Sequence, residues 1–242
     1  MMNTILSIKQ KLMQEYKYRI ELHTHTYPAS GDSVITPEEM VQIYAERGFD
    51  GVVISNHFYS TPNVGKKEKI ARYINDIERA QKEAEKYHIK VYFGAEIRFD
   101  ENKNDYLVVG MDSDILSVCY DFLPKGLEVF RQEVKLSNSL LIHAHPFRDG
   151  MVLMNPELLD GVETFNMYPR QNSRVSFAVR YAKENNISIT TPGSDIHYKN
   201  QGFETVCALR TRILPHDSFE LAAILKSGDY VFEIGEQAIV LS

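Results

Sequence analysis

The sequence predicts an α/β fold with a largely parallel sheet. Apolar runs of strand length alternate with helical segments almost throughout the 242 residues. Several of these runs are nearly continuous, as expected of parallel strands that are buried on both faces. Hydrophobic residues make up 43% of the chain, and no linker, repeat or low-complexity tract divides it. We therefore expect one domain over residues 1–242, with its sheet either closed into a barrel or left open.

The first 17 residues predict a helix that packs on this domain, because Ile8, Leu12 and Tyr16 recur at helical spacing. Lys9 and Lys11 interrupt the apolar run that a signal peptide requires. No other run approaches the roughly 18 apolar residues of a membrane span. We therefore expect a cytoplasmic protein without membrane contact.

The later elements follow in order along the chain. The predicted strands are residues 18–25, 51–55, 90–97, 106–111, 140–143, 161–165 and 187–191, with a late strand around 204–209. The predicted helices are residues 36–48, 66–87, 174–185 and 218–227. The first of these helices has the clearest start, because Thr36, Pro37 and Glu39 form the pattern of a capping box.

Composition narrows the function. A net charge of −6 argues against a general nucleic-acid binder, which normally carries a basic field. Cys119 and Cys207 are the two cysteines, lie far apart in the sequence, and predict reduced, buried thiols. The sequence carries no signal for oligomeric state.

Histidine and acidic residues recur where the predicted strands end. His23 and His25 lie two positions apart, so their side chains project the same way from an extended backbone. Asp195 and His197 repeat that spacing far downstream. Between the two pairs, strand ends carry His57, Glu96 and His145. Functional residues at the ends of many strands favour a barrel with the cluster at its mouth over an open sheet.

Imidazole and carboxylate together are typical ligands of zinc, iron or manganese, whereas calcium and magnesium prefer oxygen. Glu96 taken alone favours a carboxylate that caps a helix, but together with the His-x-His and Asp-x-His pairs it indicates a residue that can bridge two metals. Pro146 ends a strand after His145 and places that imidazole at the rim. His143 should lie one layer deeper and hydrogen-bond a ligand histidine from behind. Arg148 follows this turn, and its planar guanidinium suits a phosphate or an ordinary ion pair.

The ordered motifs, from His-x-His through strand-end His, Gly-x-Glu and His-Pro to Gly-Ser-Asp-x-His, resemble the polymerase and histidinol phosphatase (PHP) domain family. The resemblance covers about residues 18–209. It implies a distorted barrel of seven β/α units, hydrolysis of phosphoesters, and two or three divalent metal ions (zinc, iron or manganese) at the C-terminal mouth of the strands.

The resemblance also implies a ligand set for each metal. The first metal takes His23, His25, Glu96 and Asp195, the second takes Glu96 and His145, and the third takes His57, His197 and Asp32. One family histidine is absent after the strand at 106–111, where Asp112 or Asp114 could substitute.

These features predict a phosphoesterase that uses a metal-bridged hydroxide on a phosphomonoester of a small metabolite, as a histidinol phosphatase does, with Arg148 neutralising charge on the phosphoryl oxygens. The partner is then a small phosphorylated substrate rather than a nucleic acid. Two alternatives stay open: a metallohydrolase of amidohydrolase type, and a degenerate metal-binding domain without catalysis.

Overall fold

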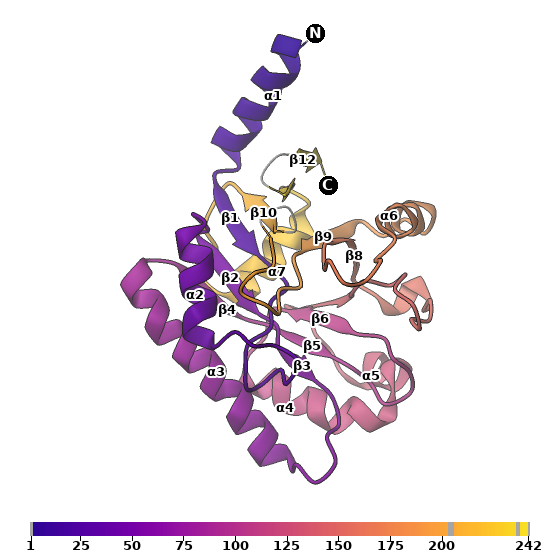
Figure 1. The fold of residues 1–242 in the computed structure, drawn as a ribbon. Coiled ribbons are helices and arrows are strands. Elements are labelled where there is room, and N and C mark those ends of the chain that lie inside the picture. Colours follow the sequence, from indigo (N-terminus) through magenta and orange to yellow (C-terminus); the bar gives the residue numbers. More distant parts are fainter. Residues whose placement is uncertain (1, 203–205, 236–237, 242) are drawn as a thin grey trace.

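The strands form two sheets with helices packed outside them (Figure 1). The computed structural model describes residues 2–202, 206–235 and 238–241. One sheet has the order β12-β11-β10-β1-β2-β4, and the other has the order β3-β5-β6-β7-β8-β9. The first contains β1 (Tyr18–Glu21), β2 (Gly51–Ile54), β4 (Lys90–Phe93), β10 (Cys207–Thr211), β11 (Val231–Ile234) and β12 (Ala238–Leu241). The second contains β3 (His57–Phe58), β5 (Ala95–Ile97), β6 (Tyr106–Val109), β7 (Leu140–His143), β8 (Gly161–Asn166) and β9 (Ile189–Gly193).

The expectation of a parallel sheet is confirmed only in part. Strands β1, β2 and β4 are parallel to one another, as are β7, β8 and β9. Strand β6, however, runs antiparallel to both β5 and β7. The predicted late strand is β10, which is antiparallel to β1, and the start of its predicted range at residues 204 and 205 lies outside the described residues.

The predicted strand at residues 90–97 is wrong as one unit, because the chain leaves one sheet and enters the other at Gly94. A Cβ atom at Gly94 would lie 2.4 Å from Cγ1 of Val53, so only glycine fits this crossing. A single bridge between Thr24 and Ile196 joins the ends of β1 and β9. The strand pairing of the described residues therefore gives two sheets joined at one point.

The predicted helices correspond to α2 (Pro37–Glu46), α3 (Lys66–Tyr87), α6 (Val175–Glu184) and α7 (Ser218–Ser227). The capping box of α2 is confirmed: Thr36 Oγ1 accepts from the Glu39 amide at 3.3 Å, and Glu39 Oε2 accepts from the Thr36 amide at 3.0 Å. We predicted no helix at α4 (Ser113–Phe122) or α5 (Leu127–Glu133). The missed signal for α4 is Asp112, whose carboxylate caps the helix by accepting from the Ile115 amide.

The N-terminal helix forms as predicted, but most of its described side chains, from Ile8 to Glu15, are exposed rather than packed on the domain. Helix α1 (Met2–Glu15) projects away from the rest of the molecule in Figure 1. Ile8 is 53% exposed and Met13 is 37% exposed. At the end of the helix, Glu15 pairs with Arg212 at 3.0 Å, and the hydroxyl of buried Tyr16 donates to Asp229 at 2.7 Å. None of the helices in the described residues has the length and apolar character to cross a membrane.

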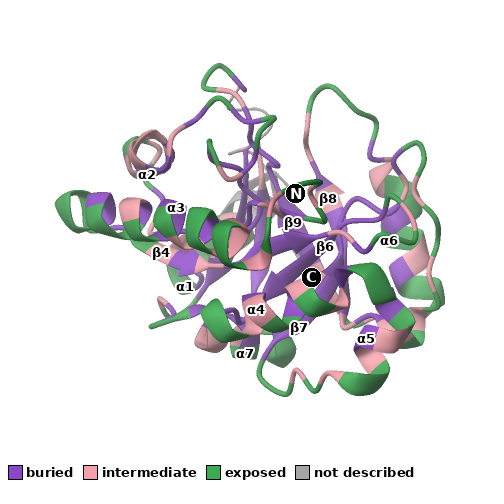
Figure 2. Ribbon diagram, turned by 90° about the horizontal axis from the view of Figure 1, so that it is seen from below, coloured by how far each residue is buried: buried purple, intermediate pink, exposed green. Residues whose placement is uncertain are grey.

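The core has two parts. One cluster collects side chains from both sheets and from α7, including Leu22, Val53, Ile142, Leu221 and Phe232. The other lies between the sheets and the helices α2 to α5. Figure 2 shows the strands buried and the outer faces of these helices exposed. Both cysteines are buried and free, as predicted.

Candidate metal centre

The bridge between β1 and β9 brings the two distant spacing motifs together. Thr24 lies between His23 and His25, and Ile196 lies between Asp195 and His197. The His25 amide donates to the Ile196 carbonyl at 3.2 Å, which fixes the two segments side by side. His25 Nε2 then lies 3.2 Å from Asp195 Oδ1, and His23 Nε2 lies 3.5 Å from the same oxygen.

Glu96 lies at the centre of the cluster, at the pairing of β3 with β5. Its Oε1 lies 3.3 Å from His23 Nε2 and 3.1 Å from His145 Nε2. Its Oε2 lies 2.6 Å from His57 Nδ1 and 3.5 Å from His25 Nε2. A carboxylate whose two oxygens face different histidines has the arrangement expected of a bridge between metal ions.

The remaining predicted ligands lie at the outer edge. Asp32 Oδ2 is 3.0 Å from His57 Nε2 and 3.5 Å from His197 Nε2. The ring of His25 lies beneath this edge, with its centroid 4.2 Å from that of His57 and 4.3 Å from that of His197. The Asp32 side chain is 56% exposed, whereas His25 is fully buried. The cluster thus extends from the core to the surface.

Four overlapping triads in this cluster have potential ligand atoms within 4.8 Å of one another. They are His25, His57 and His197; His23, Glu96 and His145; His23, His25 and Asp195; and His57, Glu96 and Asp105. Among the described residues, no hydrogen-bond partner is found for the buried atoms Nε2 of His23 and of His25, Nδ1 of His57 and Oε2 of Glu96. Such atoms are costly to bury without a partner. A group of divalent cations would satisfy them, so the donor set fits zinc, iron or manganese.

The cluster shifts the pKa values of its members in both directions. Burial, together with the neighbouring His57 and His197, lowers the pKa of His25 to about 3, so that its imidazole is neutral. Burial alone would raise the pKa of both Glu96 and Asp195. The adjacent His23 and His57 at Glu96, and His23 and Arg148 at Asp195, outweigh this effect and hold both pKa values well below their ordinary range. The carboxylates in turn outweigh burial at His23 and His57 and hold the pKa values of these two imidazoles well above their ordinary range, so metal binding there would release protons.

Two of the predicted ligands have a left-handed backbone. The φ angle is 52° at Asp195 and 29° at His145. Aspartate and histidine adopt this region more often than most residues that have a β-carbon, but still at a cost. Strain of this kind concentrates at functional sites, where the surrounding structure enforces it.

Glu163 supports the cluster from behind, and we did not predict it. Its Oε1 lies 2.7 Å from His23 Nδ1, and its Oε2 accepts from the His145 amide and from Asn166 Nδ2, each at 2.9 Å. A Cβ atom at Gly193 would lie 2.1 Å from Glu163 Oε1, so glycine is required beside it. The available signal was an acidic residue in the otherwise apolar run Gly161 to Phe165.

Glu21 holds the backbone on which the first histidine pair lies. Its Oε1 accepts from the amides of Leu22, His23 and Ser194, each at 3.0 Å. The same side chain joins α2, because its Oε2 accepts from the hydroxyl of Tyr44 at 3.1 Å. This fully buried carboxylate therefore connects the end of β1 with the segment that carries Asp195.

The direction of β6 corrects the expectation that Asp112 or Asp114 takes the place of the absent family histidine. Because β6 is antiparallel to its neighbours, the chain after it leaves the cluster, and Asp112 caps α4 instead. Asp114 follows it on the first turn of α4. Asp105, just before β6, is the acidic residue that joins Glu96 and His57 in one of the triads. Arg98 holds it through two hydrogen bonds of 2.8 Å.

The expected supporting role of His143 is wrong. Its ring stacks on Tyr106, with centroids 5.2 Å apart. In β7 it shares a face with Leu141, which belongs to the core cluster between the sheets and the helices α2 to α5. No described residue hydrogen-bonds either ring nitrogen. Glu163 and Ser30 instead contact the Nδ1 atoms of His23 and His25.

We expect His143→Phe to raise the free energy of unfolding by about 1–3 kcal/mol, because a buried polar ring without partners is replaced by an apolar ring of similar shape. Urea unfolding of metal-free protein measures this change. The metal stoichiometry of the variant should equal that of the wild type. A variant that is less stable than the wild type, or that binds less metal, would instead indicate that His143 supports a ligand histidine.

Arg148 lies at the cavity over the cluster. Its Nη2 donates to Asp195 Oδ2 at 2.6 Å and also to Asn166 Oδ1, and its Nε donates to Ser173 at 3.1 Å. The cavity measures about 150 Å³. Its lining includes Asp32, His57, Arg98, Asp105, His145, Arg148, Tyr168, Asp195 and His197. Oxygen atoms of a bound anion would there meet both the metal ligands and guanidinium groups.

Comparison with known proteins supports this geometry. The family model of the PHP domain matches residues 21–210. A DNA polymerase III of PolC type from Oceanobacillus iheyensis is 25% identical over 87% of the chain, which spans only 15% of that protein. A solved structure from Bacteroides vulgatus, a two-domain protein containing a predicted PHP-like metal-dependent phosphoesterase, has a similar fold. Its TM-score is 0.63 at 16% identity, with 90% of this chain and 64% of that chain covered.

Proposed function

The chain belongs to the PHP domain family, and from this premise we propose that it is a metal-dependent phosphoesterase acting on a phosphomonoester of a small metabolite. The observation that carries the proposal is the position of Glu96, whose two oxygens face four histidines from three separate segments. The proposal includes a histidinol-phosphatase-like reaction and a cytoplasmic location. We also propose that the two sheets together form the distorted barrel of seven β/α units. The bridge between Thr24 and Ile196, which joins the sheets, supports this proposal.

Two or three divalent ions would be held by the predicted ligands, with Asp105 added to them. The predicted set is His23, His25, Asp32, His57, Glu96, His145, Asp195 and His197. Such ions supply Lewis acidity, which lowers the pKa of water and polarises phosphoryl oxygens. We assign Asp105 to the place of the absent family histidine, because it approaches Glu96 and His57 from the antiparallel strand.

Arg148 has two tasks in the proposal. Its hydrogen bond to Asp195 fixes that carboxylate in the orientation that faces His25. Its guanidinium also lines the cavity, where it can contact phosphoryl oxygens and favour the charge that develops on them. Tyr168 covers this guanidinium, with its ring centroid 5.3 Å from Arg148 Cζ.

The two alternatives are less well supported. An amidohydrolase-type centre often has a metal-bridging lysine at a strand end, and no lysine is among the described residues that line this cavity. A degenerate domain is expected to lack several ligands, whereas all eight predicted ligands lie close together.

The first test is metal analysis of protein purified without added metal, paired with turnover of p-nitrophenyl phosphate. We expect two or three equivalents of zinc, iron or manganese, and turnover that chelation abolishes and metal restores. Reloading after chelation is the control that separates metal loss from irreversible unfolding. Protein that is inert with every reloaded metal would contradict the phosphoesterase and favour the degenerate domain.

A further inference from the structure

A second cavity adjoins the metal centre and differs from the first in its charged residues. It measures about 180 Å³, and His57 lines both this cavity and the one over the cluster. Three aspartates and two arginines line the first cavity, whereas the described residues lining the second include Lys69 and Arg72 and no carboxylate. The chain as a whole has a net charge of −6, so a cavity lined by two cationic side chains and no carboxylate is locally basic.

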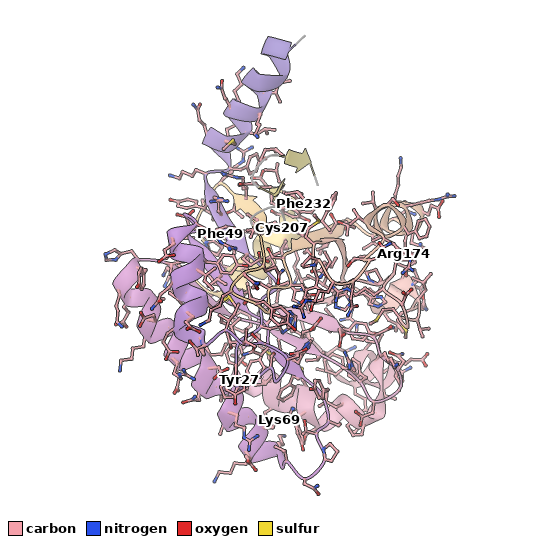
Figure 3. The ribbon with its side chains drawn as sticks, viewed as in Figure 1. Tyr27, Phe49, Lys69, Arg174, Cys207 and Phe232 are labelled. Atoms are coloured by element: carbon pink, nitrogen blue, oxygen red, sulfur yellow. The ribbon has the colours of Figure 1, made fainter. Side chains whose placement is uncertain are left out.

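Lys69 is the better placed of the two cations. It projects from α3 in Figure 3, is half-buried, and donates from Nζ to Thr61 Oγ1 at 2.8 Å. Its ammonium lies 4.9 Å from the ring centroid of Tyr59 and 5.5 Å from that of Phe58. Among the described residues it forms no ion pair with a carboxylate, whereas Arg72, which is exposed, pairs with Glu68.

The protein therefore leaves the charge of Lys69 uncompensated. Burial lowers the pKa of Lys69, and the neighbouring Arg72 lowers it further. One hydroxyl and two aromatic faces orient the ammonium but do not neutralise it. Since a lysine ammonium has three donors, the interaction with Thr61 leaves capacity for an anionic oxygen.

The position of Lys69 relative to the metal centre limits the size of such a ligand. The ring centroids of Tyr59 and His57 are 6.1 Å apart, and Lys69 Nζ lies 4.9 Å beyond the first of them. The sum of these two distances is the upper limit for the separation of Lys69 Nζ from the His57 ring. A scaffold of a few carbon atoms spans such a distance, and the second cavity, at about 180 Å³, is large enough for a phosphate or carboxylate group.

We propose that this cavity is a substrate subsite in which Lys69 binds a second anionic group, so that the substrate is a small phosphate ester carrying a further phosphate or carboxylate. The inference rests on the proposed function, because it assumes that the reacting phosphate lies over the metal ligands. Lys69 takes no part in the reaction itself. It selects the substrate by a charge-assisted hydrogen bond in a half-buried cavity.

Matched substrate pairs test the subsite. Fructose 1,6-bisphosphate is compared with fructose 6-phosphate, and 3-phosphoglycerate with glycerol 3-phosphate, by release of inorganic phosphate from metal-loaded protein. In at least one pair, we expect kcat/KM to be about tenfold or more higher for the substrate with two anionic groups than for the substrate with one. The responding pair shows whether the second group is a phosphate or a carboxylate.

The variant Lys69→Met should reduce that ratio of kcat/KM values to near one, chiefly through KM. Lys67→Met is the matched control, because Lys67 is an exposed lysine of the same helix that does not line this cavity, and its ratio should equal that of the wild type. Circular dichroism verifies that both variants fold. A wild-type ratio near one in both pairs, or an unchanged ratio in Lys69→Met, overturns the subsite.

Direct binding separates failure of the subsite from failure of the proposed function. If the wild type hydrolyses none of the four esters, calorimetric titration of chelated protein with inorganic phosphate still tests Lys69. Weakening of phosphate binding by about tenfold in Lys69→Met, but not in Lys67→Met, supports the subsite without catalysis. Equal binding by the two variants overturns it.

Discussion

Asp195→Ala should lower kcat/KM of the metal-loaded protein for p-nitrophenyl phosphate by at least two orders of magnitude. Asp195 Oδ1 faces both His23 and His25, and Oδ2 holds Arg148. Its removal takes away a metal ligand and leaves a buried guanidinium without its counter-charge. Replacing even an outer partner of a metal ligand costs roughly 10–100-fold in affinity or activity, so a direct ligand should cost more.

The matched control is Asp149→Ala, because the side chain of Asp149 is 90% exposed and forms only a surface ion pair with Arg174. We expect its turnover to stay within about twofold of the wild type. Asp195→Asn keeps the volume and separates loss of charge from loss of packing. Metal content and the unfolding temperature are measured on all three variants. Near-normal turnover in folded, metal-loaded Asp195→Ala would remove the metal centre from the mechanism.

The grouping of the candidate metal ligands was largely predictable because it depends on simple local geometry. Residues two positions apart in extended chain share a face, and parallel strands end at the same edge of a sheet. These two facts bring His23 and His25 beside Asp195 and His197, which are about 170 residues away along the chain. The residues that support these ligands follow no such spacing. Glu163 is one acidic residue in a strand, and its partners become visible only in three dimensions.

The direction of a strand cannot be inferred from its own composition. The run from Tyr106 to Val109 is apolar on both faces, as a parallel strand would be, yet it is antiparallel to its neighbours. Because of that reversal, the acidic residue beside the cluster is Asp105, before the strand, and not Asp112, after it. The break at Gly94 was missed because a glycine within a strand is consistent both with a break and with a continuous strand that another backbone approaches closely.

Glu163→Gln should weaken metal binding by about 10–100-fold, because Glu163 determines which nitrogen of His23 carries the proton. Glu163 Oε1 lies 2.7 Å from His23 Nδ1, and as a carboxylate it only accepts. His23 therefore donates from Nδ1, which leaves Nε2, the atom that faces Glu96 and Asp195, as the nitrogen that a metal would bind in place of a proton. The opposite tautomer would place a proton on Nε2, where a metal must bind.

Glutamine keeps the size of Glu163 but has one acceptor where the native side chain has two. Its amide NH₂ must face either His23 Nδ1 or the donors of His145 and Asn166. The first orientation forces the wrong tautomer on His23, and the second places donor against donor in a buried site. Competition with a chelator measures the metal affinity, and Glu157→Gln, at an exposed glutamate, is the matched control. Unchanged affinity in folded Glu163→Gln would mean that the fold alone orients His23, without the carboxylate behind it.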